Sequence, residues 1–410
     1  MLLYIDPGTG SMLFTLLIAA IGSLVYLLRG LKARMGILFS RKAKDGAGNE
    51  TLPLVLFSDH KRYWNIFEPI CDELEARGMD AVFYTESPDD PALEKPYRHI
   101  RREWIGEGNR AYARLNFLKA RVVLSSTPGL DVYQWKRSRD VPFYVHIAHA
   151  PGDVTRYRMF GLDYYDAVLL SGEYQIHQIR ELERLRGLPA KELRIVGLPY
   201  MDAMRSRLAA AGPVPAPETG KRTVLLAPSW GASGILSVYG GEILDALLAT
   251  GNRIIVRPHP QSFTSEAALL QGLMARYPDS GRLTWNRDND NFEVLRQADI
   301  LISDFSGVTF DFALIFDKPV IYADTSFDPA PYDCCWLEEK LWTFETLPRL
   351  GRQLTRENLP RVGELIEQCI RGPAYREARE RARRETWEYM GEGAKRTVDY
   401  LEEKLGTVQE

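Results

Sequence analysis

The sequence of 410 residues lacks several features that would assign a function at once. Its net charge is only -3, so no global basic field indicates a DNA or RNA partner. Its four cysteines show neither CxxC spacing nor the density of a disulfide framework, which favours a reducing compartment. GxxxxGK[ST], GxSxG, HExxH and zinc-ligand spacings are absent, which excludes the commonest nucleotide hydrolases, serine hydrolases and zinc proteases.

The amino terminus contains the one long apolar run of the chain. Residues 11–28 carry no charge, and such a run is about the minimum that spans a hydrocarbon core of ~30 Å as a helix. Asp6 is the only charged residue before the run, whereas Arg29, Lys32 and Arg34 follow it. A cleaved signal peptide is therefore disfavoured, because it would have basic residues before its apolar run. We expect a single-pass cell-membrane protein whose remaining chain is cytoplasmic. A buried amphipathic hairpin packed on the soluble domain is the alternative.

After a linker that ends near residue 50, short apolar runs alternate with helical patterns, as in an open α/β sheet of buried parallel strands. The helix pattern at residues 63–78 is typical of a crossover, because its apolar residues share one face and Gly78 ends it. The predicted strands of this first half are 52–60, 81–87, 121–126, 143–149, 166–172 and 193–199.

A Pro- and Gly-rich stretch at residues 210–221 interrupts the alternation and predicts a domain boundary. We expect an anchor and linker at 1–50, two doubly wound, Rossmann-like α/β domains at 51–210 and 221–355 facing a cleft, and helices at 356–410 packing across both. The predicted strands of the second domain are 222–230, 252–260, 298–306 and 319–324.

An anion site is predicted where an apolar strand turns into an apolar helix at Ser303, Asp304, Ser306 and Gly307. Unpaired backbone N–H groups, the positive end of the helix dipole and the two hydroxyls can converge there on a phosphate. Asp304 and Asp311 flank the site. Asp311 lies inside an apolar helix and needs a partner, either a ribose hydroxyl or a neighbouring backbone or Arg group.

Arg257 and His259 end another predicted strand in the segment RPHP. Two prolines stiffen the backbone around His259, and an imidazole of pKa ~6.5 can donate to phosphate oxygens or carry a proton to a leaving group. A structural histidine bound to a backbone carbonyl is the alternative. Because the carboxyl ends of parallel strands meet at one edge, these residues and the turn predict a nucleotide or phosphodiester site.

The first half offers a second set of candidates in VHIAHAPGDVTRYR. His149 leads into a glycine turn and can act as general base on an acceptor hydroxyl, while Arg156 and Arg158 can hold phosphate. A turn-capping role for His149 is the alternative. His146 lies on the opposite strand face if the strand continues through both histidines, so we do not expect them to share a role.

A metal site is not expected. Asp288 and Asp290 have a spacing that can chelate a divalent ion, but a solvated polar turn is the favoured interpretation of RDNDN.

Several of these motifs resemble signatures of the CDP-glycerol glycerophosphotransferase family, the teichoic acid primases and polymerases. RPHP, SDFSGVTFDFALIFDKPVIY and LAPSW are similar to that family's R-P-H-P, S-D-Y-S-S-x-x-F-D and A-P-T-W. IVGLPYMD resembles its G-x-P-R-x-D, and GEGAKRTVDYL resembles its acidic-Gly segment, with Arg396 in the matching place. The likeness covers about residues 52–405, and RPHP with SDFSG at this spacing is specific.

The resemblance implies a GT-B fold and metal-independent transfer of glycerol phosphate from CDP-glycerol to a hydroxyl, with release of CMP and without a cofactor. It implies that His149 is the base, that His259, Ser303 and Ser306 contact the donor phosphates, and that Asp311 supports the donor site. It also implies that Arg396 is a donor-binding residue. Such a site needs cationic or dipolar groups where charge spreads over the transferring phosphoryl group.

This chain departs from the family pattern at two places. Ala148 and Ala150 flank the first histidine where Trp and Gly are usual, and Tyr200 stands in place of Arg. We expect a membrane-anchored glycerophosphotransferase or polyol-phosphate relative that acts on a lipid-linked or cell-envelope acceptor. A GT-B glycosyltransferase using a nucleotide sugar, and an inactive anchored module that binds a nucleotide or envelope precursor, are the alternatives.

Overall fold

A computed structural model of the chain describes residues 51–214, 221–288, 290–372 and 375–408. The predicted membrane helix at 11–28 and the whole of the predicted anchor and linker at 1–50 lie outside these residues. Among the residues described, no helix combines the length and hydropathy that a membrane span requires. Leu52–Glu410 forms one compact unit.

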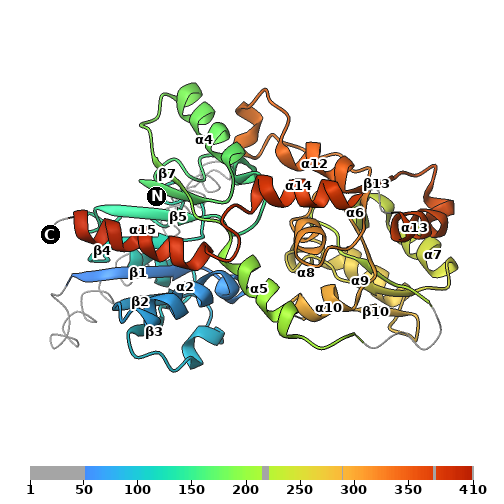
Figure 1. Cartoon of the computed structure of the whole chain (residues 1–410), viewed down its shortest axis with the longest axis horizontal. Coiled ribbons are helices and arrows are strands. Elements are labelled where there is room, and N and C mark those ends of the chain that lie inside the picture. Colours follow the sequence, from blue (N-terminus) through green and yellow to red (C-terminus); the bar gives the residue numbers. More distant parts are fainter. Residues whose placement is uncertain (1–50, 215–220, 289, 373–374, 409–410) are drawn as a thin grey trace, which may run out of the picture. The chain divides into compact units, whose positions relative to one another are not determined.

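The first half of this unit is built on a seven-stranded sheet in the order β3-β2-β1-β4-β5-β6-β7, and every neighbouring pair is parallel (Figure 1). Its inner strands are apolar and buried, as the sequence predicts, whereas β3 was missed because its sequence IRREW is mostly charged and it forms an edge. The strands are β1 (Leu52–Ser58), β2 (Ala81–Thr85), β3 (Ile100–Trp104), β4 (Ala120–Ser125), β5 (Phe143–Ile147), β6 (Ala167–Leu170) and β7 (Glu192–Ile195).

Helices connect these strands, and the predicted crossover helix is present as α2 (Trp64–Ala76), which buries its apolar face. The other helices of this half are η1 (Lys61–Tyr63), η2 (Pro91–Glu94), α3 (Asn109–Leu115), η3 (Val154–Arg156), α4 (Glu173–Arg186) and α5 (Pro199–Ala210).

The second half contains a six-stranded sheet in the order β10-β9-β8-β11-β12-β13, again with parallel pairs throughout. The edge strands β10 and β13 were not predicted. The strands are β8 (Thr223–Leu226), β9 (Arg253–Val256), β10 (Leu283–Trp285), β11 (Ile300–Ser303), β12 (Val320–Ala323) and β13 (Gly351–Leu354).

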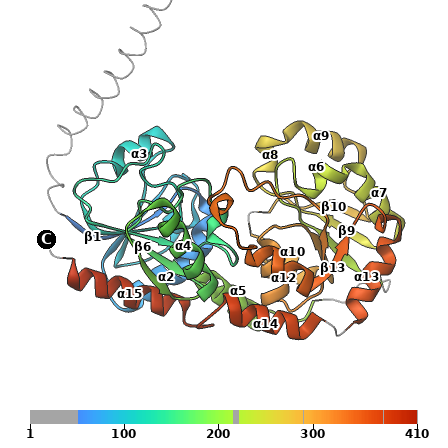
Figure 2. The same ribbon diagram turned by 90° about the horizontal axis from the view of Figure 1, so that it is seen from above.

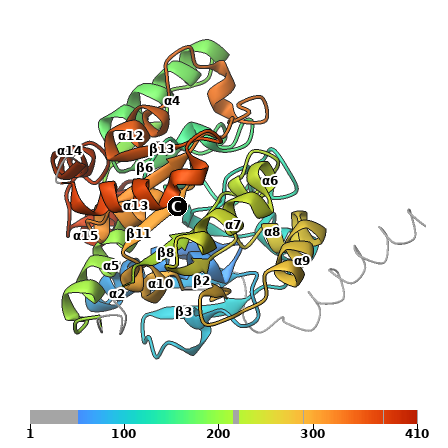
Figure 3. The ribbon, with the colours of Figure 1, turned by 90° about the vertical axis from the view of Figure 1, so that its right-hand side faces the viewer.

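Helices flank this second sheet as well, and α7 and α13 lie side by side on it (Figures 2 and 3). They are α6 (Ile235–Tyr239), α7 (Gly241–Ala249), α8 (Ser262–Ser265), α9 (Ala267–Arg276), α10 (Phe292–Gln297), α11 (Val308–Phe310), η4 (Asp311–Ile315), η5 (Asp333–Trp336), α12 (Trp342–Leu350), η6 (Leu359–Arg361) and α13 (Val362–Arg371).

The chain then runs back along both halves. Helix α14 (Arg376–Thr386) contacts α12 and η4 of the second half and α4 of the first, and α15 (Gly393–Thr407) contacts α2, α5 and β4 (Figure 1). One apolar cluster includes buried residues of both sheets. The predicted α/β fold with two parallel sheets is confirmed. The predicted domain boundary at 210–221 stays a prediction.

Candidate functional site

The candidate residues follow the carboxyl ends of four strands, as expected for an α/β ligand site. Arg62 and Tyr63 follow β1, and His149 follows β5. In the second sheet, His259 follows β9 and Asp304 follows β11. A Cβ placed on Gly307 would lie 3.8 Å from the Cβ of Ala150, so the turn after β11 meets the turn after β5. Residues from both halves therefore converge.

His149 lies beside two tyrosines. Its Nδ1 is 3.0 Å from the hydroxyl of Tyr157, and its ring centroid is 5.1 Å from that of Tyr63. Burial lowers the pKa of His149 to about 4, opposed by a hydrogen bond to the backbone of Ser126 and reinforced by the charge of Arg62. The imidazole is therefore neutral at neutral pH.

His146 shares a hydrogen-bond partner with His149. Its Nε2 is 3.2 Å from the same Tyr157 hydroxyl. Because β5 ends at Ile147, strand alternation does not direct the side chain of His149, and the expectation that the two histidines share no role stays a prediction. A hydroxyl has one proton, so Tyr157 can donate to one ring and accept from the other.

His259 is held in one orientation by its own turn. Its Nδ1 accepts a 3.1 Å hydrogen bond from the backbone N–H of Gln261, so the neutral ring carries its proton on Nε2. Burial lowers the pKa of His259 to about 4, and the charges of Arg62 and Arg257 act in the same direction. The neutral ring is thus a donor, as a contact with phosphate oxygens requires.

Ser303 does not offer its hydroxyl to a ligand, which contradicts the role that the resemblance implied. Its side chain is fully buried, and its Oγ donates a 2.6 Å hydrogen bond to the carbonyl of Ala227. As the last residue of β11, it points between strands and ties them together at their ends. Of the two predicted hydroxyls, only that of Ser306 remains available to an anion, together with the backbone N–H groups of the turn.

Asp304 also has a structural role. Its carboxylate accepts hydrogen bonds from the backbone N–H groups of Ser229 (2.9 Å), Ile235 (3.1 Å) and Ser306 (3.1 Å). Burial raises the pKa of Asp304, and these bonds oppose the rise. Asp304 therefore shapes the anion turn rather than contacting a ligand.

Asp311 finds its partner within the protein. The hydroxyl of Tyr200 donates a 2.7 Å hydrogen bond to Oδ1, so the partner is neither the backbone group nor the Arg that we considered. Burial raises the pKa of Asp311 to about 6, although hydrogen bonds from Tyr200 and Asn291 lower it. This contact joins α5 of the first half to η4 of the second.

The predicted arginines divide into two groups. The guanidinium of Arg156 lies 5.4 Å from the ring centroid of Phe305 and 5.3 Å from that of Phe327, beside the anion turn, and its Nε is buried without a hydrogen-bond partner. Arg257, which directly follows β9, donates a hydrogen bond to the side chain of Asn286. Arg158, in contrast, is exposed and pairs its backbone with that of Tyr332.

Arg396 forms no contact with the anion turn among the residues that the structure describes, and its implied donor role stays a prediction. It pairs with Glu392 at 2.8 Å and stacks on Tyr389 at 3.5 Å. Its segment instead receives Asp202, whose carboxylate accepts hydrogen bonds from the backbone N–H groups of Gly391 (2.7 Å) and Gly393 (2.9 Å). Two of the motifs that carried the resemblance therefore contact each other and support the fold.

Arg62 was missed by the sequence analysis. It lies at the carboxyl end of β1, the same sheet edge that carries His149, and its charge reaches both His149 and His259. No motif distinguishes it among the 52 Lys and Arg residues. Its position after the first strand was the only available signal.

A cavity of about 600 Å³ lies elsewhere and is lined mainly by residues of α4, α12 and α14. Its wall is a polar network in which Glu385 accepts hydrogen bonds from the indole of Trp342 (2.8 Å) and from Arg349 (3.0 Å). Tyr174 stacks on Trp342 and donates to the carbonyl of Gly152 at 2.9 Å. The cavity contains none of the predicted site residues, and its network supports the turn that follows His149.

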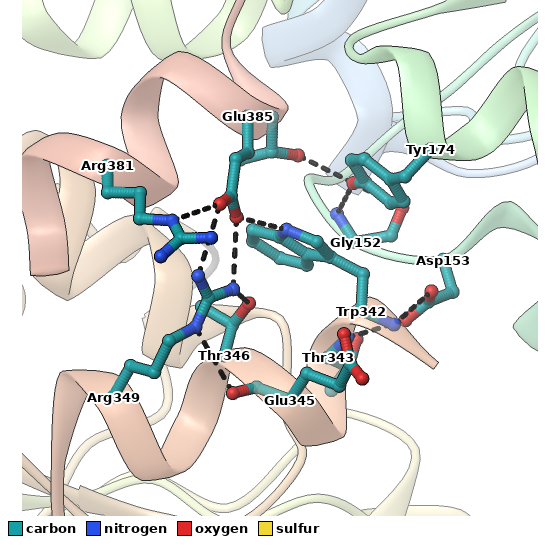
Figure 4. Close-up of polar contacts among 11 residues, drawn as sticks. Gly152, Asp153, Tyr174, Trp342, Thr343, Glu345, Thr346, Arg349, Arg381 and Glu385 are labelled. Atoms are coloured by element: carbon teal, nitrogen blue, oxygen red, sulfur yellow. Dashed lines mark hydrogen bonds and ion pairs between the residues drawn. The ribbon is translucent and has the colours of Figure 1, made fainter. Parts of the chain in front are cut away.

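Asp153 fixes the same turn from the other side. Its carboxylate accepts hydrogen bonds of 2.9 Å from the backbone N–H groups of Trp342 and Thr343, and so caps the amino end of α12 (Figure 4). The described part of the chain contains no cluster of His, Cys, Asp and Glu that could hold a metal ion. Asp290 forms an ion pair with Arg207 at 2.6 Å.

Comparison with known protein structures identifies similar folds. Two structures of the wall teichoic acid polymerase TagF soaked with CDPG are similar to this chain. The first gives a TM-score of 0.52 at 14% identity and covers 94% of this chain and 98% of the TagF chain. The second gives a TM-score of 0.53 at 15% identity and covers 86% of this chain and 89% of the TagF chain. The UDP-GlcNAc 2-epimerase of Methanocaldococcus jannaschii gives a TM-score of 0.51 at 13% identity, covering 86% of this chain and all of that one (100%). These similarities show a GT-B-like fold.

Comparison by sequence is more specific. No curated protein matches the chain. Residues 162–334, however, match the family model described as CDP-Glycerol:Poly(glycerophosphate) glycerophosphotransferase. This segment contains RPHP, the anion turn and Tyr200. The resemblance to the CDP-glycerol glycerophosphotransferase family that the motifs predict is thereby confirmed over these residues.

Proposed function

We propose that the protein transfers glycerol phosphate, or a related polyol phosphate, from a CDP-activated donor to a hydroxyl of a lipid-linked or cell-envelope acceptor and releases CMP. One observation carries the proposal. A neutral histidine from each half, His149 and His259, lies within the field of one arginine, Arg62, where the turn of Ala150 meets that of Gly307. This arrangement suits transfer of a phosphoryl group between two substrates.

The chemistry divides between the two histidines. His149 takes the proton of the acceptor hydroxyl, whose oxygen forms a bond to the phosphorus of the glycerol phosphate unit. The bond from that phosphorus to the oxygen of CMP breaks, and CMP leaves with the electron pair. His259 donates its Nε2–H to a phosphate oxygen and stabilises the charge that spreads over the transferring group.

Tyr157 prepares His149 for this step. Its hydroxyl occupies Nδ1 of His149, so the acceptor hydroxyl takes its place there when it binds. The displaced Tyr157 keeps His146 as a partner, because that ring is already 3.2 Å away. The exchange therefore leaves no buried hydroxyl unpaired. An unpaired buried hydroxyl would cost ~1–3 kcal/mol.

A donor screen tests the proposal. The purified full chain is incubated with CDP-glycerol, other CDP-polyols and UDP-sugars, and released nucleotide is measured by chromatography. CMP release that depends on the acceptor supports the proposal. UDP release from a UDP-sugar would indicate the nucleotide-sugar glycosyltransferase instead, and binding without turnover would indicate the inactive binding module.

We also propose that residues 11–28 anchor the protein in the cell membrane with the remaining chain in the cytoplasm, on the basis of their uncharged run and the basic residues after it. Expression of the chain with and without its first 50 residues tests this. The full chain should sediment with membranes after a carbonate wash, and the shortened chain should not. Recovery of both in the soluble fraction would refute the anchor.

A further inference from the structure

The loop between β1 and α2 presents one arginine to the site in a fixed way. The hydroxyl of Ser58 donates to the carbonyl of His60 at 2.9 Å, and Nδ1 of His60 accepts from the backbone N–H of Arg62 at 3.1 Å. The backbone N–H of Lys61 donates to the hydroxyl of Ser87 at 3.0 Å. Three consecutive residues are thus tied to their surroundings, and the backbone that carries the Arg62 side chain is held in place.

The guanidinium of Arg62 forms no ion pair with any acid in the described part of the chain. Its Nε is buried without a hydrogen-bond partner. Its one described side-chain contact is with the ring of Tyr63, 5.4 Å from the centroid. A buried donor without an acceptor costs free energy, so the position favours an acceptor brought by a ligand.

The nearest carboxylate does not supply that acceptor. Burial raises the pKa of Asp59 and the charge of Arg62 lowers it, so the two groups sense each other. They form no ion pair, however, and the Oδ1 of Asp59 is itself buried without a partner. The charge of Arg62 therefore remains available to an anion.

The surroundings of Arg62 are those of a phosphate site. The Tyr63 ring on which it lies is 5.1 Å from the ring of His149, and its charge acts on both His149 and His259. The charge of one arginine thus acts on a ring from each half of the protein. A phosphoryl group is the anion that such a set of donors binds best, because a guanidinium can bind two of its oxygens at once.

We propose that Arg62 is a phosphate-binding residue whose guanidinium, together with His149 and His259, forms a site for a phosphoryl group of the substrate. The phosphoryl group belongs either to the nucleotide donor or to a phosphate-bearing acceptor. Assignment to CDP-glycerol rests on the proposed function, whereas the anion site itself does not.

Calorimetric binding to the full chain tests this site with three probes: inorganic pyrophosphate, CDP-glycerol and cytidine. Arg62→Ala removes the guanidinium, and Arg62→Lys keeps the charge without the planar fork. Arg139→Ala is the matched control, because Arg139 is exposed in the same half and its loss changes the charge equally. Far-UV circular dichroism and thermal melting confirm that each variant is folded.

We expect Arg62→Ala to weaken pyrophosphate binding about tenfold or more, Arg62→Lys to weaken it less, and Arg139→Ala to leave it unchanged. A matching loss for CDP-glycerol identifies the donor as the source of the phosphate, and an intact CDP-glycerol affinity identifies the acceptor. Cytidine binding should not change. The proposal is overturned if the wild type does not bind pyrophosphate, if Arg62→Ala binds it normally, or if cytidine binding falls as much.

These outcomes are separable from those of the proposed function. Loss of pyrophosphate binding in Arg62→Ala supports the site even if CDP-glycerol is never turned over. Turnover of CDP-glycerol that is unchanged in Arg62→Ala, with unchanged pyrophosphate binding, overturns the site and leaves the proposed function standing.

Discussion

The hydroxyl of Tyr200 donates a 2.7 Å hydrogen bond to Oδ1 of Asp311 and thereby links helix α5 of the first half to η4 of the second. Tyr200 stands where the resembling family usually has arginine, and Asp311 belongs to the segment after the anion turn. The donor is a neutral hydroxyl, and burial raises the pKa of the carboxyl group that accepts from it to about 6. The departure in sequence thus coincides with a contact between the halves.

Removal of this hydroxyl should destabilise the protein. We expect Tyr200→Phe to lower the free energy of unfolding by about 1–2 kcal/mol, because a buried carboxyl group loses a donor while the ring stays in the core. Urea denaturation followed by circular dichroism measures the change. Tyr133→Phe is the control, since Tyr133 is exposed and should tolerate the change. Equal stability of Tyr200→Phe and wild type would show that the bond contributes nothing.

Asp311 should make stability depend on pH. Its pKa in the folded protein, about 6, is above the unfolded value of 3.8, so its contribution is fully present below pH 3.8 and is lost as pH rises through 6. Asp311→Asn keeps an acceptor for Tyr200 and removes the titration. We expect the stability of the wild type relative to Asp311→Asn to fall by about 2 kcal/mol between pH 4 and pH 7. Parallel pH profiles in urea denaturation would refute the raised pKa.

Asp202 should stabilise the segment before α15, where the chain runs back onto the first half. Besides the two glycine N–H groups, it accepts a 2.9 Å hydrogen bond from the indole of Trp387. We expect Asp202→Ala to cost about 2–3 kcal/mol and to shift the fluorescence of Trp387, because three donors lose one acceptor. Asp202→Asn, which keeps one acceptor oxygen, should cost less. Similar losses in both variants would mean that charge rather than geometry matters.

The pH dependence of turnover should reveal neutral histidines. Because the pKa values of His149 and His259 are lowered to about 4, both rings stay neutral down to about pH 5. We expect kcat/KM for the donor to remain near its plateau at pH 5.5. If the base were an ordinary histidine of pKa ~6.5, kcat/KM at pH 5.5 would be about one tenth of its plateau value. That result would contradict the lowered pKa values of the two histidines. Circular dichroism at pH 5.5 controls for unfolding.

Much of the fold could be predicted from sequence because the inner strands are continuous apolar runs with turn residues behind them. The strands β3, β10 and β13 could not, since edge strands are short and partly exposed and their sequences resemble loops. The strand ends that carry His149 and His259 were predicted for the same reason that the sheets were.

The directions of side chains were harder to predict. Ser303 was expected to face a phosphate, but as the last residue of β11 it binds the neighbouring strand end. Arg62 could not be found, because its importance comes from its position beside residues that are far away in sequence. Arg396 and Asp202 resemble family motifs, and only the packing of α15 on the first half shows that Asp202 supports the fold.

Acceptor-dependent release of CMP from CDP-glycerol by the full chain, compared among wild type, His149→Ala, His259→Ala and the surface variant His177→Ala, tests the central claim most directly. The account predicts turnover in wild type and His177→Ala, and a loss of about a hundredfold or more in kcat for each of the other two. Turnover that is unchanged in both His149→Ala and His259→Ala would contradict it.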